Sequence, residues 1–102
     1  MNERPSPRPA TDPRPVVVVT GASAGIGRAI AREFAGHGWR VALLARGSDG
    51  LQGAAADVQR AGGQALVLPT DVADEAAVEA AAAAVEAKWG AIDVWEIGRA
   101  HV

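Results

Sequence analysis

The sequence has no cysteine, no long apolar run and no surplus of positive charge, and each absence excludes a class of protein. Without cysteine, disulfide bonds, thiolate metal ligands and a cysteine nucleophile are excluded. The strongly apolar runs, such as residues 16–19, fall far short of the roughly 20 residues that cross a bilayer. A formal net charge of −2 attracts neither nucleic acid nor an anionic membrane. We therefore expect a soluble, cytoplasmic protein with no nucleic-acid or membrane partner.

The proline and arginine content divides the chain. Five of its six prolines and three of its ten basic residues fall within residues 1–15, which have almost no apolar content. We expect this segment to be a disordered arm. It also lacks the apolar core of a signal peptide. The rest of the 102 residues allows one domain.

From residue 16 onward, short apolar runs alternate with helix-length segments. Residues 16–19 are four valines, which suits a strand buried on both faces of a parallel sheet. Apolar side chains then recur every four residues, which predicts a helix that closes at the glycines near residue 36. The same alternation predicts strands at residues 41–44, 65–68 and 91–95. It also predicts a helix that is capped by Ser48 or Asp49 and ends at residues 62–63, and a third helix over residues 74–89. We predict an α/β fold, a doubly wound parallel sheet of strand order 3-2-1-4 with three helices.

A glycine-rich turn, TGASAGIG, lies between the first predicted strand and the first predicted helix. At such a turn, residues without a Cβ let the backbone approach a pyrophosphate, and the helix N-terminus faces the anion. Gly21 allows the tight turn, Gly25 the close approach and Gly27 the packing of helix on strand. Ser23 adds a hydroxyl donor. A Walker A loop is excluded because Arg28 stands where that motif needs lysine.

This turn in this setting resembles the cofactor loop of the short-chain dehydrogenase/reductase family, and the resemblance extends over residues 16–95. It implies a Rossmann fold, a nicotinamide cofactor and, in the full-length protein, hydride transfer between the cofactor and a small carbonyl or alcohol substrate. It also implies a homo-oligomeric parent protein. The residues that the resemblance places at the pyrophosphate are Gly21, Ser23, Ala24, Gly25, Ile26 and Gly27.

Arg46 bears on the choice of cofactor. In dinucleotide folds an acidic residue after the second strand binds the ribose 2′-hydroxyl, whereas an arginine accommodates a 2′-phosphate. Here that strand runs into Ala45 and Arg46, with no carboxylate. We therefore expect NADP(H) to be preferred over NAD(H). The alternative is a solvated arginine at a strand end, and Ala24 occupies the loop position where NADP-dependent relatives often carry a second basic residue.

Two residues after the third strand, Asp71 and Val72, resemble the adenine contact of the family. The resemblance implies that Asp71 accepts from the exocyclic amine and that Val72 covers the ring. The alternative is that Asp71 is a turn residue. The two histidines have no partner at ligand spacing, so we expect no metal site and place His37 at a helix end. The three tryptophans are expected to be packing residues.

The resemblance ends after residue 95. Members of the family continue into Asn-Asn-Ala-Gly and later supply a catalytic Asn, a Ser and a Tyr-x-x-x-Lys pair, whereas this chain reads EIGRAHV and has no tyrosine. We therefore assign residues 16–95 to the N-terminal part of an NAD(P)-binding domain that lacks catalytic residues and is inactive by itself. EIGRAHV is also an in-frame translation of a widely used sequencing adapter, so we expect residues 96–102 to be an artefactual tail.

Two other functions are compatible with these residues. The first is a non-enzymatic nucleotide-binding or regulatory Rossmann module, and the second is a flavodoxin-like receiver that binds no dinucleotide.

Overall fold

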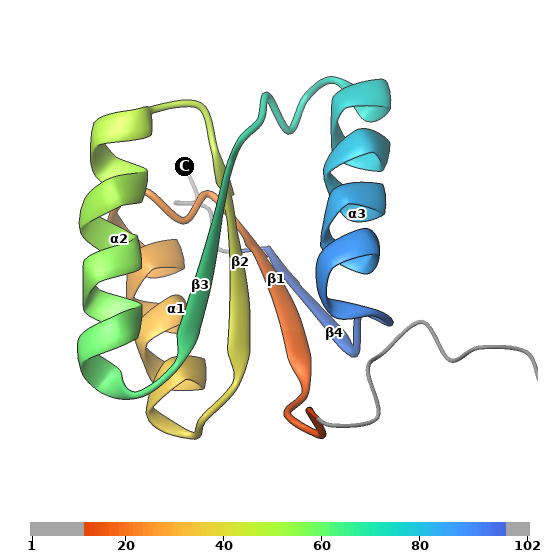
Figure 1. The fold of residues 1–102 in the computed structure, drawn as a ribbon. Coiled ribbons are helices and arrows are strands. Elements are labelled where there is room, and N and C mark those ends of the chain that lie inside the picture. The colour runs from red at the N-terminus through yellow and green to blue at the C-terminus, as the bar shows by residue number, and fades with distance from the viewer. Residues whose placement is uncertain (1–11, 98–102) are drawn as a thin grey trace, which may run out of the picture.

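Strands and helices alternate along the whole described chain (Figure 1). The structure is a computed structural model that describes residues 12–97. The elements in chain order are β1 (Val16–Thr20), α1 (Gly25–Gly36), β2 (Arg40–Ala45), α2 (Ser48–Ala61), β3 (Gln64–Pro69), α3 (Glu75–Trp89) and β4 (Val94–Ile97).

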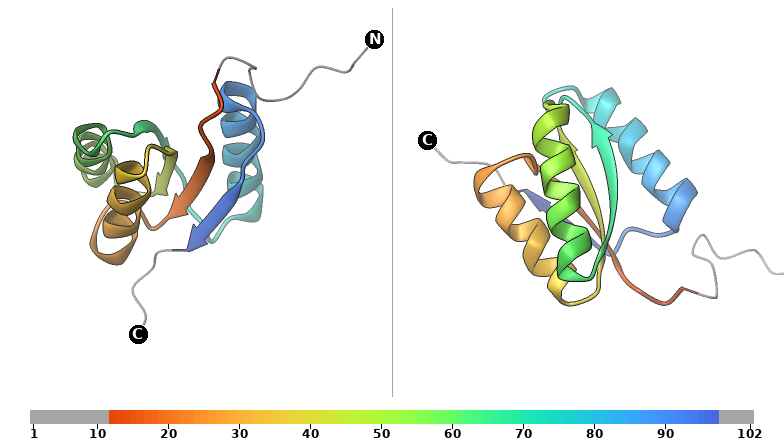
Figure 2. Two further views of the ribbon diagram at one scale, coloured as in Figure 1. Left: turned by 90° about the horizontal axis from the view of Figure 1, so that it is seen from below. Right: turned by 60° about the vertical axis from the view of Figure 1, so that its left-hand side comes forward.

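The strands form one parallel sheet of order β3-β2-β1-β4, as predicted. Helices α1 and α2 cover one face and α3 covers the other (Figures 1 and 2). From β1 the chain adds β2 and then β3 on one side, and after β3 it returns to add β4 on the other side of β1. Because crossovers between parallel strands are right-handed, this reversal places α3 on the opposite face from α1 and α2. The fold is the first part of a Rossmann-type doubly wound sheet.

Strand β1 lies at the centre of the molecule, and the prediction that it is buried on both faces is confirmed. All four of its valines have 0% exposure. Val17 and Val19 pack in the core cluster formed with α1 and α2, while Val16 and Val18 pack in the cluster formed with α3. The run of valines therefore holds the two layers together.

The last strand differs from its predicted span. It was expected at residues 91–95, but β4 is Val94–Ile97. Asp93 binds the start of β1 partly through its side chain. Its backbone N–H donates to the Val16 carbonyl (2.9 Å), and its Oδ2 accepts from the Val16 N–H (2.8 Å). The pairing with β1 consequently begins one residue later, at Val94.

Strand β4 also includes Glu96 and Ile97, which belong to the segment assigned to an artefactual tail. Residues 98–102 lie outside the described residues, and the origin of the tail stays a prediction. Trp95 was expected to be a packing residue, but it is 43% exposed because β4 lies at the edge of the described sheet. Trp89 is a packing residue, at 3% exposure, and Trp39 packs edge-on against Phe34.

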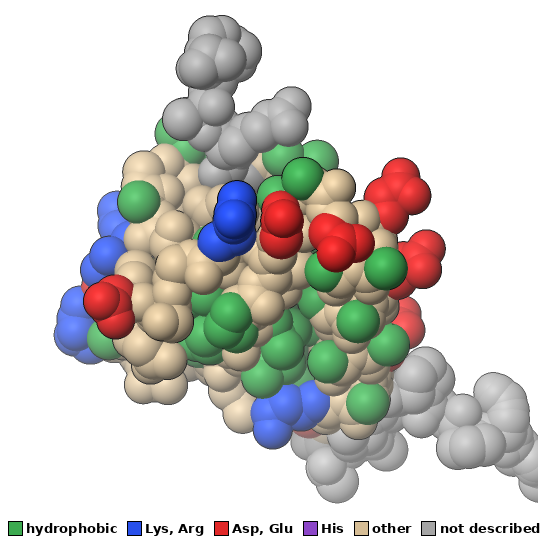
Figure 3. Space-filling model, turned by 90° about the horizontal axis from the view of Figure 1, so that it is seen from above, with side chains coloured by type: hydrophobic (Ala, Val, Ile, Leu, Met, Phe, Trp, Pro, Cys, Tyr) green, Lys and Arg blue, Asp and Glu red, His purple; other side chains and the backbone are tan. Residues whose placement is uncertain are grey.

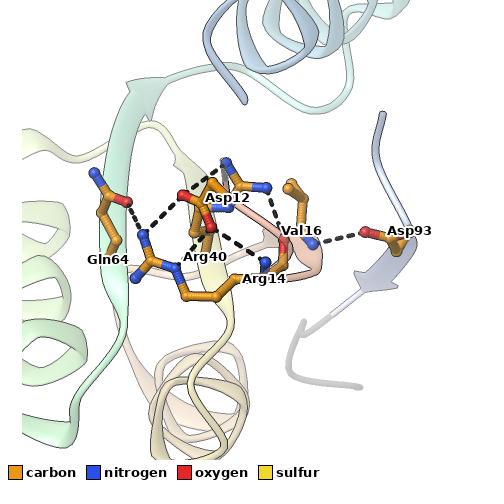
Figure 4. A network of polar contacts seen from close by, with 6 residues as sticks. All are labelled: Asp12, Arg14, Val16, Arg40, Gln64 and Asp93. Carbon is orange, nitrogen blue, oxygen red and sulfur yellow. Dashed lines mark hydrogen bonds and ion pairs between the residues drawn. The ribbon is translucent and has the colours of Figure 1, made fainter. Parts of the chain in front are cut away.

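The segment just before β1 contacts the sheet from Asp12 onward, although the predicted arm extends to residue 15 (Figure 4). The side chain of Arg40 is 1% exposed, and its guanidinium donates to the Arg14 carbonyl (2.7 Å) and pairs with Asp12 (3.4 Å). The Arg14 side chain also binds Asp12, which holds the pKa of that carboxyl far below its usual range. Residues 1–11 of the arm lie outside the described residues.

A cluster of charges joins α1 to α2. Asp57 on α2 accepts from Arg28 Nε on α1 (2.6 Å) and from Arg60 Nη2 (2.6 Å), and Arg32 lies 3.5 Å away. The hydrogen bond from Arg28 is the main cause that lowers the pKa of Asp57. Gly53 leaves room for this bond, since a Cβ there would lie 3.0 Å from the Arg28 guanidinium.

This cluster predicts a loss of stability in acid. A carboxyl whose pKa is lowered by folding stabilises the native state above its ordinary value of 3.8 and loses that contribution as the pH falls through the lowered value. We expect the urea midpoint to fall as the pH is lowered from about 5 to about 2. Asp57→Asn should lower the midpoint at neutral pH and reduce its slope with pH, whereas Glu86→Gln, at an exposed site on α3, should change neither. An unaltered slope in Asp57→Asn would contradict the assignment.

Candidate functional site

The three loops that follow β1, β2 and β3 all lie at the carboxyl edge of the sheet (Figure 1). Figure 3 looks down on this edge, where basic side chains gather over the α1–α2 flank and acidic ones over the α3 flank. The strand order reverses between β1 and β4, and ligands of doubly wound sheets bind outside the carboxyl ends of the strands at such a point. The predicted site residues fall on these three loops.

The loop between β1 and α1 has the backbone that its glycines predict. Gly21 and Gly25 have φ angles of +64° and +60°, which residues with a Cβ rarely adopt. Between them, the N–H of buried Ala22 donates to the Leu44 carbonyl at 3.2 Å. The loop is therefore tied to the end of β2.

The first turn of α1 is free of competing groups. Its N-cap residue, Ala24, has no side chain that can accept from the helix N–H groups, and no acidic residue lies in the turn. Helix α3 differs, because Asp74 accepts from the N–H groups of Ala76 and Ala77. Helix α2 also lacks a capping side chain, but it carries Asp49 in its first turn. The first turn of α1 therefore leaves its N–H groups and the positive end of its dipole open to an anion, with no side chain accepting from them and no carboxylate in the turn.

The other residues of this loop are placed as follows. Gly25 is exposed, and nothing lies within 4 Å of the position its Cβ would take. Ile26 is 55% exposed, while Gly27 is buried. Ser23 is half-buried and packs against Gly50 of α2. The loop thus leaves open space beside Gly25 and has a closed side toward α2.

Arg46 lies directly after β2, at the same edge as the β1–α1 loop, and is exposed. It forms no hydrogen bond or ion pair with any residue in the described range. Its planar guanidinium can therefore offer all of its donors to a phosphate.

Asp71 and Val72 lie in the loop after β3. The Oδ1 of Asp71 accepts from the Ala73 N–H (3.0 Å). Asp71 therefore makes the side-chain contact expected of a turn residue. That bond uses one of the two carboxylate oxygens, and the adenine role stays a prediction. Val72 is 47% exposed and lines a cavity of about 390 Å³.

That cavity lies on the α3 side of the sheet and is also lined by residues to which the sequence assigned no binding role. They are Thr20, Val78, Trp95 and Ile97. Thr20 is the first residue of the TGASAGIG motif, so its place at the end of β1 was the signal that could have identified it. Trp95 and Ile97 of β4 belong to no motif of the sequence analysis, so they carried no such signal.

Residues 12–97 contain no group of three or more histidine, cysteine, aspartate or glutamate side chains that could hold a metal ion. No helix in that range is long and apolar enough to cross a membrane. His37 lies at the C-cap of α1, where it was predicted, and its Nε2 is 3.4 Å from a carboxylate oxygen of Glu33.

The fold and the loop after β1 define a Rossmann-type, dinucleotide-binding class of domain. The short chain dehydrogenase model matches residues 15–96, and the chain belongs to this family. It is 43% identical over 79 residues to D-threitol dehydrogenase of Mycolicibacterium smegmatis, an alignment that covers 78% of this chain and 30% of that protein.

Solved structures of the family share the fold. L-sorbose reductase of Gluconobacter frateurii, complexed with NADPH and L-sorbose, superposes with a TM-score of 0.78 at 36% identity, covering 87% of this chain and 34% of that one. A metagenomic short-chain oxidoreductase in complex with NADP gives a TM-score of 0.77 at 41% identity, covering 86% and 39%. The chain thus spans about a third of the length of these relatives and corresponds to their N-terminal, cofactor-binding region.

Proposed function

We propose that this chain is the NADP(H)-binding region of an oxidoreductase that transfers hydride between the nicotinamide cofactor and a small carbonyl or alcohol compound. The observation that carries the proposal is the start of α1. It combines a glycine at φ +60°, open space beside that glycine, and a first turn without a capping side chain or a carboxylate. These features fit a pyrophosphate.

Each site residue has a role in this proposal. The N–H groups of the β1–α1 loop hold the pyrophosphate, with the Ser23 hydroxyl as a further donor, and Arg46 binds the 2′-phosphate. Asp71 and Val72 contact the adenine. When bound, the cofactor supplies the hydride. The chain has no tyrosine, so in this proposal proton transfer belongs to groups outside it.

A titration tests the proposal. Tryptophan fluorescence of the chain is followed while NADPH is added, and then NADH in a second series. Trp95 is a suitable reporter because it lies in the cavity with Thr20 and Val72. We expect saturable quenching with NADPH at lower concentrations than with NADH. No change with either nucleotide would refute cofactor binding by this chain.

The preference for NADPH is tested by Arg46→Ala. Loss of one charge-assisted hydrogen bond to a phosphate should weaken NADPH binding by about tenfold. Binding of NADH, which has no 2′-phosphate, should change by less than about twofold. The matched control is Lys88→Ala, which removes an exposed positive charge from the last turn of α3, away from the β1–α1 loop and from Arg46. Equal weakening of both nucleotides by Arg46→Ala would argue against a 2′-phosphate contact.

A further inference from the structure

Gly50 in the first turn of α2 is in unusually close contact with the β1–α1 loop. A Cβ built on Gly50 would lie 2.7 Å from the Cβ of Ser23 and 2.9 Å from the Ser23 carbonyl oxygen. Cβ atoms do not approach other heavy atoms this closely, and one of the two contacts is backbone, which cannot rotate away. Any side chain at residue 50 must therefore move the loop or the helix.

The two segments that meet at this contact carry different parts of the proposed site. Ser23 directly precedes the N-cap of α1, where the pyrophosphate would bind. Gly50 lies four residues after Arg46, which would bind the 2′-phosphate. On this side the loop meets β2 at Ala22, whose N–H donates to the Leu44 carbonyl, and meets α2 at Ser23, which lies against Gly50.

We propose that Gly50 is a positioning residue that sets the spacing between the pyrophosphate-binding loop and the 2′-phosphate-binding arginine. This inference rests on the proposed function and adds a residue that touches no part of the cofactor. A ligand that spans both segments depends on their spacing, whereas a ligand held by one segment does not.

The experiment compares Gly50→Ala with Gly47→Ala in the full chain. Gly47 is the N-cap residue of the same helix, has a φ of −85°, and has nothing within 4 Å of its Cβ position. Two probes are titrated: NADPH, which reaches both segments, and 2′-AMP, which has the adenosine and the 2′-phosphate but no pyrophosphate. We expect Gly50→Ala to weaken NADPH by about tenfold and 2′-AMP by less than about twofold, with Gly47→Ala close to the unmodified chain for both.

Equal weakening of both probes, or of neither, would overturn the proposal. If the unmodified chain binds neither probe, the proposed function fails, and the backbone amide resonances of Ser23, Ala24 and Gly25 decide the positioning role separately. They should shift in Gly50→Ala and not in Gly47→Ala, and unshifted resonances would overturn it. If Gly50→Ala does not fold, the double variant Ser23→Gly/Gly50→Ala removes the 2.7 Å contact and leaves the 2.9 Å contact with the Ser23 carbonyl, so it should recover part of the folded signal in far-UV circular dichroism. A double variant with no more folded signal than Gly50→Ala would also overturn the proposal.

Discussion

Gly25→Ala is expected to weaken NADPH binding by about a hundredfold, which corresponds to the loss of two charge-assisted hydrogen bonds. The built Cβ meets no protein atom within 4 Å, so it would project into open space beside the loop. That space is where the pyrophosphate must approach the N–H groups of α1. The measurement is the same fluorescence titration with NADPH.

The control for this variant separates backbone strain from obstruction of the ligand. Gly25 has φ +60°, so alanine there also costs about 1–2 kcal/mol of stability. Gly38 has φ +85° and equally open surroundings, but it lies between α1 and β2, at the opposite edge of the sheet. Gly38→Ala should therefore lose similar stability and keep NADPH affinity. Similar affinity losses in both variants would show that strain alone explains the effect at Gly25.

Leu43→Ala is expected to destabilise the chain by about 2–5 kcal/mol. Leu43 is fully buried in β2, in the cluster that β1 and β2 form with α1 and α2. Removing its side chain leaves a cavity that the surrounding helices cannot fill by relaxation. A domain of this length has a free energy of unfolding of roughly 5–15 kcal/mol, so one such cavity removes a large part of it.

Urea unfolding, followed by far-UV circular dichroism, measures the loss. Leu43→Met keeps the volume of the side chain and should cost less than about 1.5 kcal/mol, so it serves as the control. A Leu43→Ala midpoint equal to that of Leu43→Met would mean that this cluster contributes little to the stability of the fold.

Much of the fold could be predicted from local patterns. Four consecutive valines predict a strand buried on both faces, and β1 is such a strand. The alanine-rich segment before Gly90 predicts a helix, and α3 is observed there. Strand order followed from the handedness of crossovers, a rule that depends only on the sequence of elements. These features depend on residue type and spacing, which are read directly from the chain.

The ends of elements were predicted less well. The cap of α2 was expected at Ser48 or Asp49, but the N-cap is Gly47 and no side chain caps the helix. Strand β4 begins at Val94 because Asp93 binds the backbone of Val16, 77 residues away in the chain. Contacts between distant residues determine these boundaries, and a local pattern carries no trace of them.

For the candidate site, the sequence alone determined which residues stand at the carboxyl edge. The glycines of the TGASAGIG turn, Arg46 and the Asp71–Val72 pair each follow a strand, and parallel strands end at one edge. Only the tertiary structure decided how the loops meet: that Ala22 is tied to Leu44, and that Ser23 lies against a glycine of α2. The physical reason is that strand and helix periodicities depend on neighbouring residues, whereas the approach of two loops depends on how two separate crossovers pack on the same sheet.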